Sequence, residues 1–216
     1  MRRQNRCIPR KPAHTVFYLI DTNFLVYRLF DASRITNATE KHRTEVAQTY
    51  WQEIDAQRKV GKAKVFVLDV CIAEAFKTLA KKYYNGSGIF PKPAYLNQAR
   101  EKLRGEVHLT ARDAAKANRN ISFHDIQTSR DIILGVDRFF ERVFKQNRKV
   151  GIIDLMILST ARFLIDFLGF ERDRLFIITM DGPLYELAKT YTDLPAAFNP
   201  DKSADAPSKV FSDSLH

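Results

Sequence analysis

The sequence FYLIDTN at residues 17–23 decides the fold. Its first four residues are bulky and apolar without polar alternation, which is typical of a strand buried on both faces of a parallel sheet. Asp21 follows at the carboxyl end of this strand, the edge at which open α/β sheets bind their ligands. The sequence LFIITMD at residues 175–181 repeats the arrangement before Gly182-Pro183 opens a helix. The two stretches predict an α/β fold in which Asp21 and Asp181 share one edge of a sheet.

Other strands and helices are expected on the same grounds. The run VFVL at 65–68 has the buried-strand pattern, ISFHDI at 121–126 alternates as an edge strand does, and residues 196–198 form a short last strand. Apolar residues at helical spacing predict helices over residues 23–30, 44–60, 70–84, 129–143, 154–168 and 183–191. The alternation of strands and helices predicts a sheet with parallel strands.

The length of 216 residues suits one α/β domain with an elaboration. Residues 1–12 hold five cations, two prolines and no acid, so we expect a flexible basic arm. Residues 13–200 are expected to form the domain, with a helical insertion at about 85–119 that follows a glycine-rich and proline-rich break. Residues 201–216 are rich in Asp, Ser, Lys and Pro, which predicts a disordered tail.

The formal charge of +10 and the isoelectric point of about 9.6 favour a polyanionic partner such as nucleic acid, although a merely solubilising surface explains them equally well. Cys7 and Cys71 are too few for a disulfide framework, so we expect a reducing cytoplasm. We expect no membrane span, because the most apolar stretch, residues 155–170, contains Arg162 and Asp166.

Four acids follow or precede strongly apolar sequence at a strand end or helix start: Asp21, Glu74, Asp154 and Asp181. Right-handed crossovers between parallel strands bring such positions to one edge of the sheet. Acids brought together repel one another unless a cation neutralises them, and Mg²⁺ or Mn²⁺ suits ligands that are all oxygen. Zinc fits poorly, because no His or Cys cluster accompanies these acids. The competing interpretation is helix capping by Asp154 and Asp181 and a solvated surface position for Glu74.

These motifs resemble those of PIN-domain nucleases, and especially of VapC-type toxins. The resemblance covers about residues 15–200 and depends on IDTN at 20–23, VCIAEA at 70–75, GIIDLMIL at 151–158 and ITMD at 178–181. It implies a three-layer α/β/α fold with a central parallel sheet of order 3-2-1-4-5. It also implies a Mg²⁺- or Mn²⁺-dependent endoribonuclease whose acids are supported by Asn23 and Thr179. Relatives of this type form homodimers and are inhibited by an antitoxin protein.

The expected helix after residue 129 has a basic exposed face. Arg138, Arg142, Lys145 and Lys149 lie near one another on it and suit the phosphate backbone of RNA. The competing interpretation is a set of solvated cations without a ligand.

Three other functions are compatible with parts of the pattern. A phosphatase of the haloacid dehalogenase type also begins with an aspartate after its first strand, but it needs a second aspartate where this chain has Asn23. A DNA-directed metal nuclease would share the acidic cluster. A non-catalytic RNA-binding module would share the fold and the charge, and would lose no activity on Asp21→Asn.

Overall fold

The computed structural model describes residues 15–107, 123–146 and 149–211. The basic arm expected at residues 1–12 lies outside this part of the chain. So do residues 108–122, which include the end of the expected insertion, and the last five residues of the expected tail.

A five-stranded parallel sheet forms the centre of the molecule, in the order β3-β2-β1-β4-β5. The strands are β1 (Val16–Ile20), β2 (Ala63–Leu68), β3 (His124–Ile126), β4 (Leu175–Ile178) and β5 (Ala196–Phe198). The predicted sheet and its order 3-2-1-4-5 are confirmed. Ile20 pairs with Ile178 in the register of β1 and β4, so Asp21 and Thr179 leave the sheet side by side.

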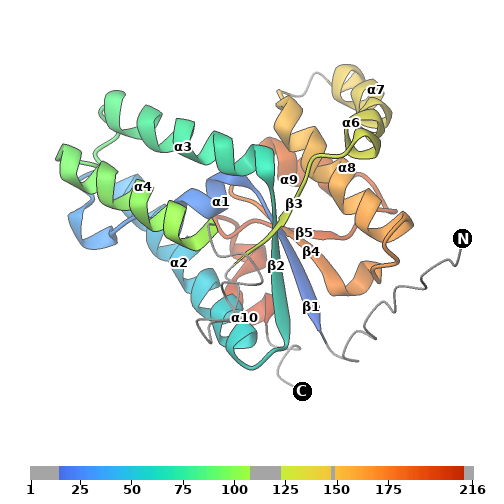
Figure 1. Cartoon of the computed structure of the whole chain (residues 1–216), viewed down its shortest axis with the longest axis horizontal. Coiled ribbons are helices and arrows are strands. Elements are labelled where there is room, and N and C mark those ends of the chain that lie inside the picture. The colour runs from blue at the N-terminus through green and yellow to red at the C-terminus, as the bar shows by residue number, and fades with distance from the viewer. Residues whose placement is uncertain (1–14, 108–122, 147–148, 212–216) are drawn as a thin grey trace, which may run out of the picture.

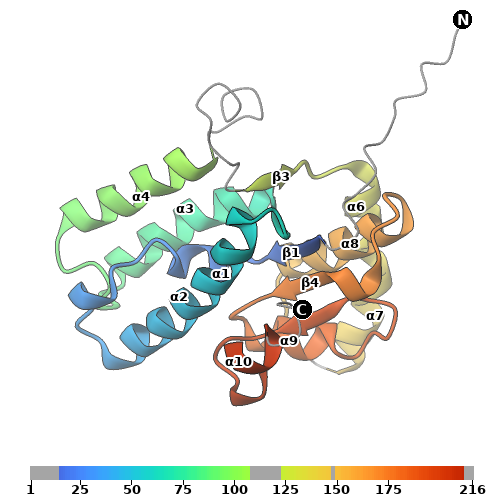
Figure 2. The same cartoon turned by 90° about the horizontal axis from the view of Figure 1, so that it is seen from below.

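Helices cover the two faces of this sheet. One group contains α1 (Thr22–Tyr27), α2 (Ala38–Lys59), α3 (Asp69–Tyr84) and α4 (Pro93–Val107), and the other contains α6 (Arg130–Gly135), α7 (Asp137–Lys145) and α8 (Ile152–Asp166). Figures 1 and 2 show these groups on opposite sides of the sheet. The chain also forms α9 (Gly182–Ala188), α10 (Pro207–Val210) and three short 3-10 helices, η1 (Ala32–Arg34), η2 (Arg172–Arg174) and η3 (Ser203–Asp205). In the described residues, no helix is long and apolar enough to cross a membrane.

The core is built around β1, as its uninterrupted apolar sequence requires. Tyr18, Leu19 and Ile20 are at most 1% exposed, because neighbouring strands flank β1 on both edges and helices cover both faces. The Tyr18 hydroxyl is satisfied by a 2.7 Å hydrogen bond to Gln57 Oε1 of α2. Burial of this strand fixes the positions of the residues that follow it, beginning with Asp21.

The helix expected over residues 129–143 is divided into α6 and α7 at Val136, so the prediction of one helix is wrong. Gly135 lies against α8, where a Cβ atom would be only 2.4 Å from Ser159 Oγ. The Ser159 hydroxyl donates a 2.6 Å hydrogen bond to the Ile132 carbonyl of α6. This close approach of α6 to α8 is a tertiary contact that helical periodicity does not reveal.

The prediction of a disordered tail is wrong for residues 201–211. Phe211 is 3% exposed, and its ring centroid lies 5.1 Å from that of Tyr50 and 6.2 Å from that of Tyr18. Asp205 Oδ2 accepts a 2.9 Å hydrogen bond from the Asn199 backbone N–H. One aromatic residue and one buried acid therefore anchor a segment whose composition is otherwise typical of disorder.

Candidate active site

Asp21 occupies the carboxyl end of β1 and caps the N-terminus of α1. Its Oδ1 accepts a 2.6 Å hydrogen bond from the Phe24 backbone N–H, and its Oδ2 accepts one from the Thr179 hydroxyl. The residue is only 1% exposed. The pKa of the Asp21 carboxyl is raised to about 7, because burial and, to a lesser degree, the charges of Asp154 and Asp181 outweigh the lowering effect of the two hydrogen bonds.

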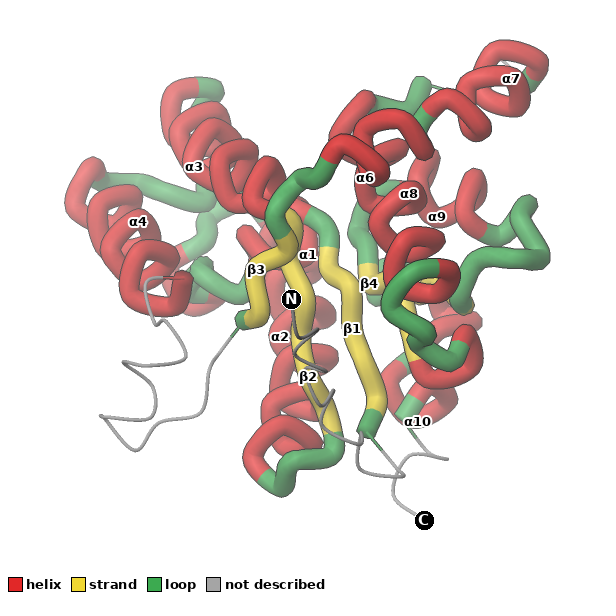
Figure 3. The backbone as a smooth tube through the Cα atoms, turned by 45° about the vertical axis from the view of Figure 1, so that its right-hand side comes forward, coloured by secondary structure: helices red, strands yellow, loops and turns green. Residues whose placement is uncertain are grey.

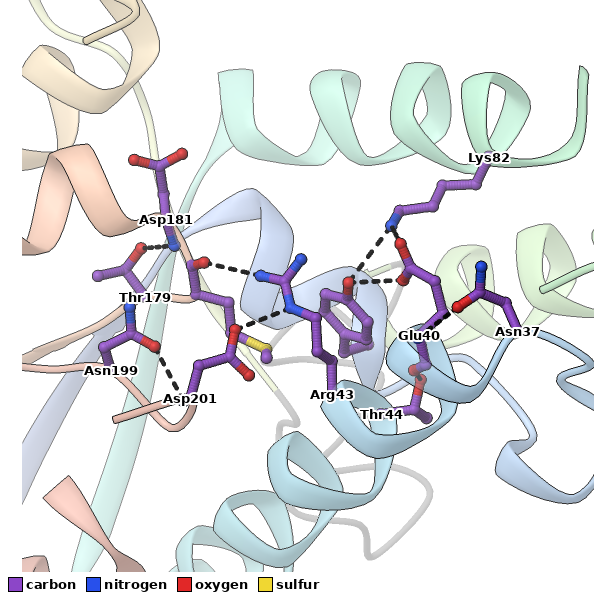
Figure 4. A network of polar contacts seen from close by, with 11 residues as sticks. Asn37, Glu40, Arg43, Thr44, Lys82, Thr179, Asp181, Asn199 and Asp201 are labelled. Carbon is purple, nitrogen blue, oxygen red and sulfur yellow. Dashed lines mark hydrogen bonds and ion pairs between the residues drawn. The ribbon is translucent and has the colours of Figure 1, made fainter. Parts of the chain in front are cut away.

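Asp181 follows β4 and caps α9 in the same manner. Its Oδ1 accepts a 2.8 Å hydrogen bond from the Leu184 backbone N–H. Its own backbone N–H donates a 2.8 Å hydrogen bond to Thr179 Oγ1, as Figure 4 shows. Because the Thr179 hydroxyl also donates to Asp21, one threonine side chain links the two acids that end β1 and β4.

Asp154 and Glu74 come from two helices that start at the same edge of the sheet. Asp154 Oδ2 accepts a 2.9 Å hydrogen bond from the Gly151 backbone N–H at the start of α8, and Glu74 Oε2 accepts a 2.9 Å hydrogen bond from the Thr22 hydroxyl. Burial raises the pKa of Asp154 to about 6, with further contributions from the charges of Asp181 and Glu74. The four acids therefore lie close enough for their charges to interact.

Asp21 accepts hydrogen bonds on both carboxylate oxygens, whereas Asp154, Asp181 and Glu74 each use one. Within the described ranges, no hydrogen bond occupies Asp154 Oδ1, Asp181 Oδ2 or Glu74 Oε1. In the same part of the chain, no three His, Cys, Asp or Glu side chains are close enough together to hold one metal ion. A cation here would have two carboxylates at most as direct ligands in the observed side-chain positions.

The donor set fits a hard divalent cation. Mg²⁺ binds through one or two carboxylates and keeps several of its waters, so it does not require three protein ligands at one point. Burial and the neighbouring acids raise the pKa values of Asp21 and Asp154, and a bound cation would favour the ionised form of both carboxylates. Zinc fits poorly, because in the described residues no cluster of His and Cys side chains accompanies these acids.

A polar network on α2 supports the segment that carries Asp181 (Figure 4). The Arg43 guanidinium donates a 3.0 Å hydrogen bond to the Met180 carbonyl and pairs with Asp201 at 2.8 Å. One turn earlier on α2, Glu40 pairs with Lys82 of α3 at 2.7 Å and accepts a 2.7 Å hydrogen bond from the Tyr27 hydroxyl. Helix α2 is thus joined both to the residue before Asp181 and to the helix that carries Glu74.

Sequence reasoning missed Thr22 and Arg43. Thr22 follows Asp21 directly, so a hydroxyl beside a strand-end acid was the available signal. No local signal marks Arg43, which comes from the middle of a polar helix. Thr179 contacts the acids as the resemblance implies, whereas in the described part of the chain Asn23 makes no hydrogen bond to them.

The predicted RNA-binding cations lie apart from the acids. Arg138, Arg142 and Lys145 line a pocket of about 370 Å³ on α7 together with Tyr191, and Lys149 is exposed beyond α7 and is not among the residues that line it. Arg138 is 2.6 Å from Asp193, and Arg142 lies 4.2 Å above the Tyr191 ring.

Comparisons with known proteins give a likeness of structure. No family model matches the chain, and no curated protein is similar to it in sequence. A chain in the crystal structure of VapBC2 from Rickettsia felis, bound to a DNA fragment from their promoter, is 14% identical with a TM-score of 0.50, covering 85% of this chain and 98% of that one. A chain of FitAcB from Neisseria gonorrhoeae is 15% identical with a TM-score of 0.48, covering 85% and 97%.

The likeness to the VapBC2 chain covers 85% of this chain, in which a five-stranded parallel sheet carries helices on both faces. This chain has the PIN-like α/β/α fold. At such low identity the comparison shows the fold alone, so the role of the acids has to be argued from their chemistry.

Proposed function

We propose that the protein is a Mg²⁺- or Mn²⁺-dependent endoribonuclease. The observation that carries the proposal is the burial of Asp21, directly after β1, beside the charges of Asp154 and Asp181, with Glu74 next to Asp154. A buried carboxylate next to like charges costs stability, and such an arrangement is typical of a site that binds a cation or does acid–base chemistry. The PIN-like fold and the formal charge of +10 favour a nucleic acid as substrate.

Asp21 and Asp181 would be direct ligands of the cation, with Glu74 and Asp154 acting in part through water. The cation would supply charge neutralisation at the scissile phosphate and a lower pKa for an attacking water. The chain's own residues do the positioning: Thr179 holds Asp21 and the backbone of Asp181 together, and Thr22 orients Glu74. Asp154 and Glu74 then face the site with one unoccupied oxygen each and can accept a proton from water.

We also propose a cytoplasmic role as the toxin of a toxin–antitoxin pair, as a homodimer inhibited by an antitoxin protein. This extends the resemblance to VapC-type toxins. Co-expression with the product of an adjacent short reading frame tests it, because an antitoxin should co-purify with the protein and suppress cleavage. Light scattering of the purified protein tests the homodimer.

The decisive test is cleavage of a labelled single-stranded RNA by wild type, Asp21→Asn and Asp173→Asn. Asp173 lies at the opposite end of β4 from Asp181 and is exposed, so it controls for the loss of a negative charge. We expect cleavage with Mg²⁺ or Mn²⁺ by wild type and Asp173→Asn, and none by Asp21→Asn or with excess EDTA. Equal cleavage by all three proteins, or cleavage in EDTA, would refute the proposal.

Two further arms separate the competing functions. A DNA strand of the same sequence distinguishes a DNA-directed nuclease from a ribonuclease. If wild type binds RNA but no protein cleaves it, and Asp21→Asn binds equally well, the non-catalytic RNA-binding module is the correct reading.

A further inference from the structure

A pocket on α7, separate from the acidic site, is rich in positively charged side chains. It is lined by Arg138, Glu141, Arg142, Lys145, Gln146 and Tyr191. Three of these side chains are cations and one is an acid. The cations fall at positions i, i+4 and i+7 of α7, so they share one face of the helix and point into the same space.

The pocket is partly preorganised by Arg142. Its guanidinium lies 4.2 Å above the Tyr191 ring and donates a hydrogen bond to the Thr190 carbonyl. These contacts fix the plane of the guanidinium, and a fixed plane favours bidentate binding of a phosphate. The Tyr191 hydroxyl is buried and has no hydrogen-bond partner among the described residues, so the contribution of Tyr191 to the pocket rests on its ring.

The other two cations are held loosely. Arg138 pairs with Asp193 at 2.6 Å with both side chains 39% exposed, and Lys145 pairs with Glu141 while both are more than 70% exposed. Ion pairs as exposed as these contribute little to stability, so exchanging the acid for a phosphate costs the protein little.

The pocket lies at the far end of α9 from the acids. Asp181 caps the start of α9, and Tyr191 follows its end; seven helical residues span roughly 10 Å. Figures 1 and 3 place α7 at the end of the molecule where β1 and β2 lead into α1 and α3, which is the edge that carries the acids. A strand of a few nucleotides would reach from one site to the other.

We propose that this pocket binds a backbone phosphodiester of the RNA strand and holds it while a neighbouring phosphodiester lies at the acids. The inference rests on the proposed ribonuclease function and adds to it the path of the substrate. The pocket recognises a phosphate and makes no contact that requires a 2′-hydroxyl, so specificity for RNA must come from elsewhere.

The test is binding of a labelled single-stranded RNA, followed by anisotropy over a range of salt concentrations. All proteins carry Asp21→Asn and all solutions contain EDTA, so that cleavage does not interfere. The pocket variants are Lys145→Gln and Glu141→Gln, and the control is Lys62→Gln. Lys62 is an exposed cation that precedes β2 at the opposite edge of the sheet, so the control removes the same charge.

A single-strand phosphate contact contributes a slope of about 0.7 to the dependence of log affinity on log salt, or about fivefold in affinity near 0.1 M salt. We expect Lys145→Gln to lose about this much affinity and slope, and Lys62→Gln to lose neither. Glu141→Gln should bind more tightly than its parent, because it removes the acid that competes for Lys145. A DNA strand of the same sequence should show the same differences.

Equal effects of Lys145→Gln and Lys62→Gln would show that only the net charge matters and would overturn the inference. The inference would also be overturned if inorganic phosphate bound to the pocket, if this binding required Lys145, and if RNA did not displace the phosphate. The pocket would then be a site for a free anion. These outcomes are independent of the ribonuclease test, in which the pocket residues are unchanged and cleavage is the measurement.

Discussion

Replacing Asp21 by Asn should stabilise the metal-free protein at neutral and alkaline pH. Burial raises the pKa of Asp21 in the folded protein to about 7 from its ordinary value of 3.8, so an ionised Asp21 is less favourable in the folded protein than in the unfolded chain. The penalty is absent below pH 3.8, grows as the pH rises, and is complete above about pH 7. A difference of about three pH units at about 1.4 kcal/mol each makes it ~4 kcal/mol.

The quantity to measure is the difference in unfolding free energy between Asp21→Asn and wild type, in EDTA, from pH 4 to pH 8. It should shift in favour of the variant by about 4 kcal/mol across this range, or by about 8–16 °C in Tm for a chain of this length. Any loss of hydrogen bonding by the amide adds a constant offset, because an asparagine does not titrate. Asp173→Asn, at an exposed position, is the control for the loss of one negative charge.

Saturating Mg²⁺ or Mn²⁺ should reduce the advantage of the variant at pH 8, since a cation bound by ionised Asp21 stabilises only the wild type. A stability difference that stays constant from pH 4 to pH 8 would refute the reasoning. It would mean that Asp21 is solvated well enough to ionise normally, and that no need for a cation follows from its burial.

Three further predictions concern packing and support. Gly135→Ala should lower the unfolding free energy by about 1–3 kcal/mol because its Cβ would collide with Ser159, whereas Gly105→Ala on the open face of α4 should be neutral or stabilising, as urea unfolding of both variants will show. Phe211→Ala should lower the free energy of unfolding by about 3 kcal/mol, because it removes a buried aromatic side chain. An unchanged thermal unfolding temperature would show that residues 201–211 do not contribute to stability. Arg43→Met should reduce kcat for RNA cleavage by about 10- to 100-fold with little change in KM, because the Met180 carbonyl before Asp181 loses its hydrogen-bond donor. Arg43→Lys should recover part of the lost kcat. A change confined to KM would contradict a positioning role for Arg43.

The sequence predicted those strands whose own residues form a clear apolar pattern. Strands β1 and β4 are uninterrupted apolar runs ended by polar residues, so their burial, their adjacency and the position of Asp21 at the sheet edge could all be inferred. The strand order came from the resemblance. The break at Val136 and the order in residues 201–211 could not be inferred, because each depends on a contact with a distant residue: Ser159 for Gly135, and Tyr50 for Phe211.

The candidate site was predicted as a set of acids, and the residues that hold them were predicted in part. Thr179 came from the resemblance and makes the expected contact with Asp21. Thr22 and Arg43 were missed, since a hydroxyl or a guanidinium becomes meaningful only when the fold shows which atom it donates to. Their roles depend on side-chain direction, which spacing along the sequence does not determine.

The sequence offered helix capping and a role in the acidic site as alternative interpretations of Asp154 and Asp181, and the structure shows that capping does not exclude the second. Helix capping was the competing explanation for Asp154 and Asp181, and both residues do cap helices, as does Asp21. In Asp154 and Asp181 the cap uses one carboxylate oxygen and leaves the other without a hydrogen bond in the described residues, whereas in Asp21 the second oxygen accepts a hydrogen bond from Thr179. Capping therefore fixes the direction in which the second oxygen points, since the first is held by a backbone N–H whose position the helix determines. For Asp154 and Asp181 capping is the means by which the fold directs a carboxylate oxygen toward the site. A variant that keeps the cap but removes the charge, such as Asp181→Asn or Asp181→Ser, separates the two roles. Such a variant should unfold at nearly the same temperature as wild type and should not cleave RNA, whereas Asp181→Ala should lose both.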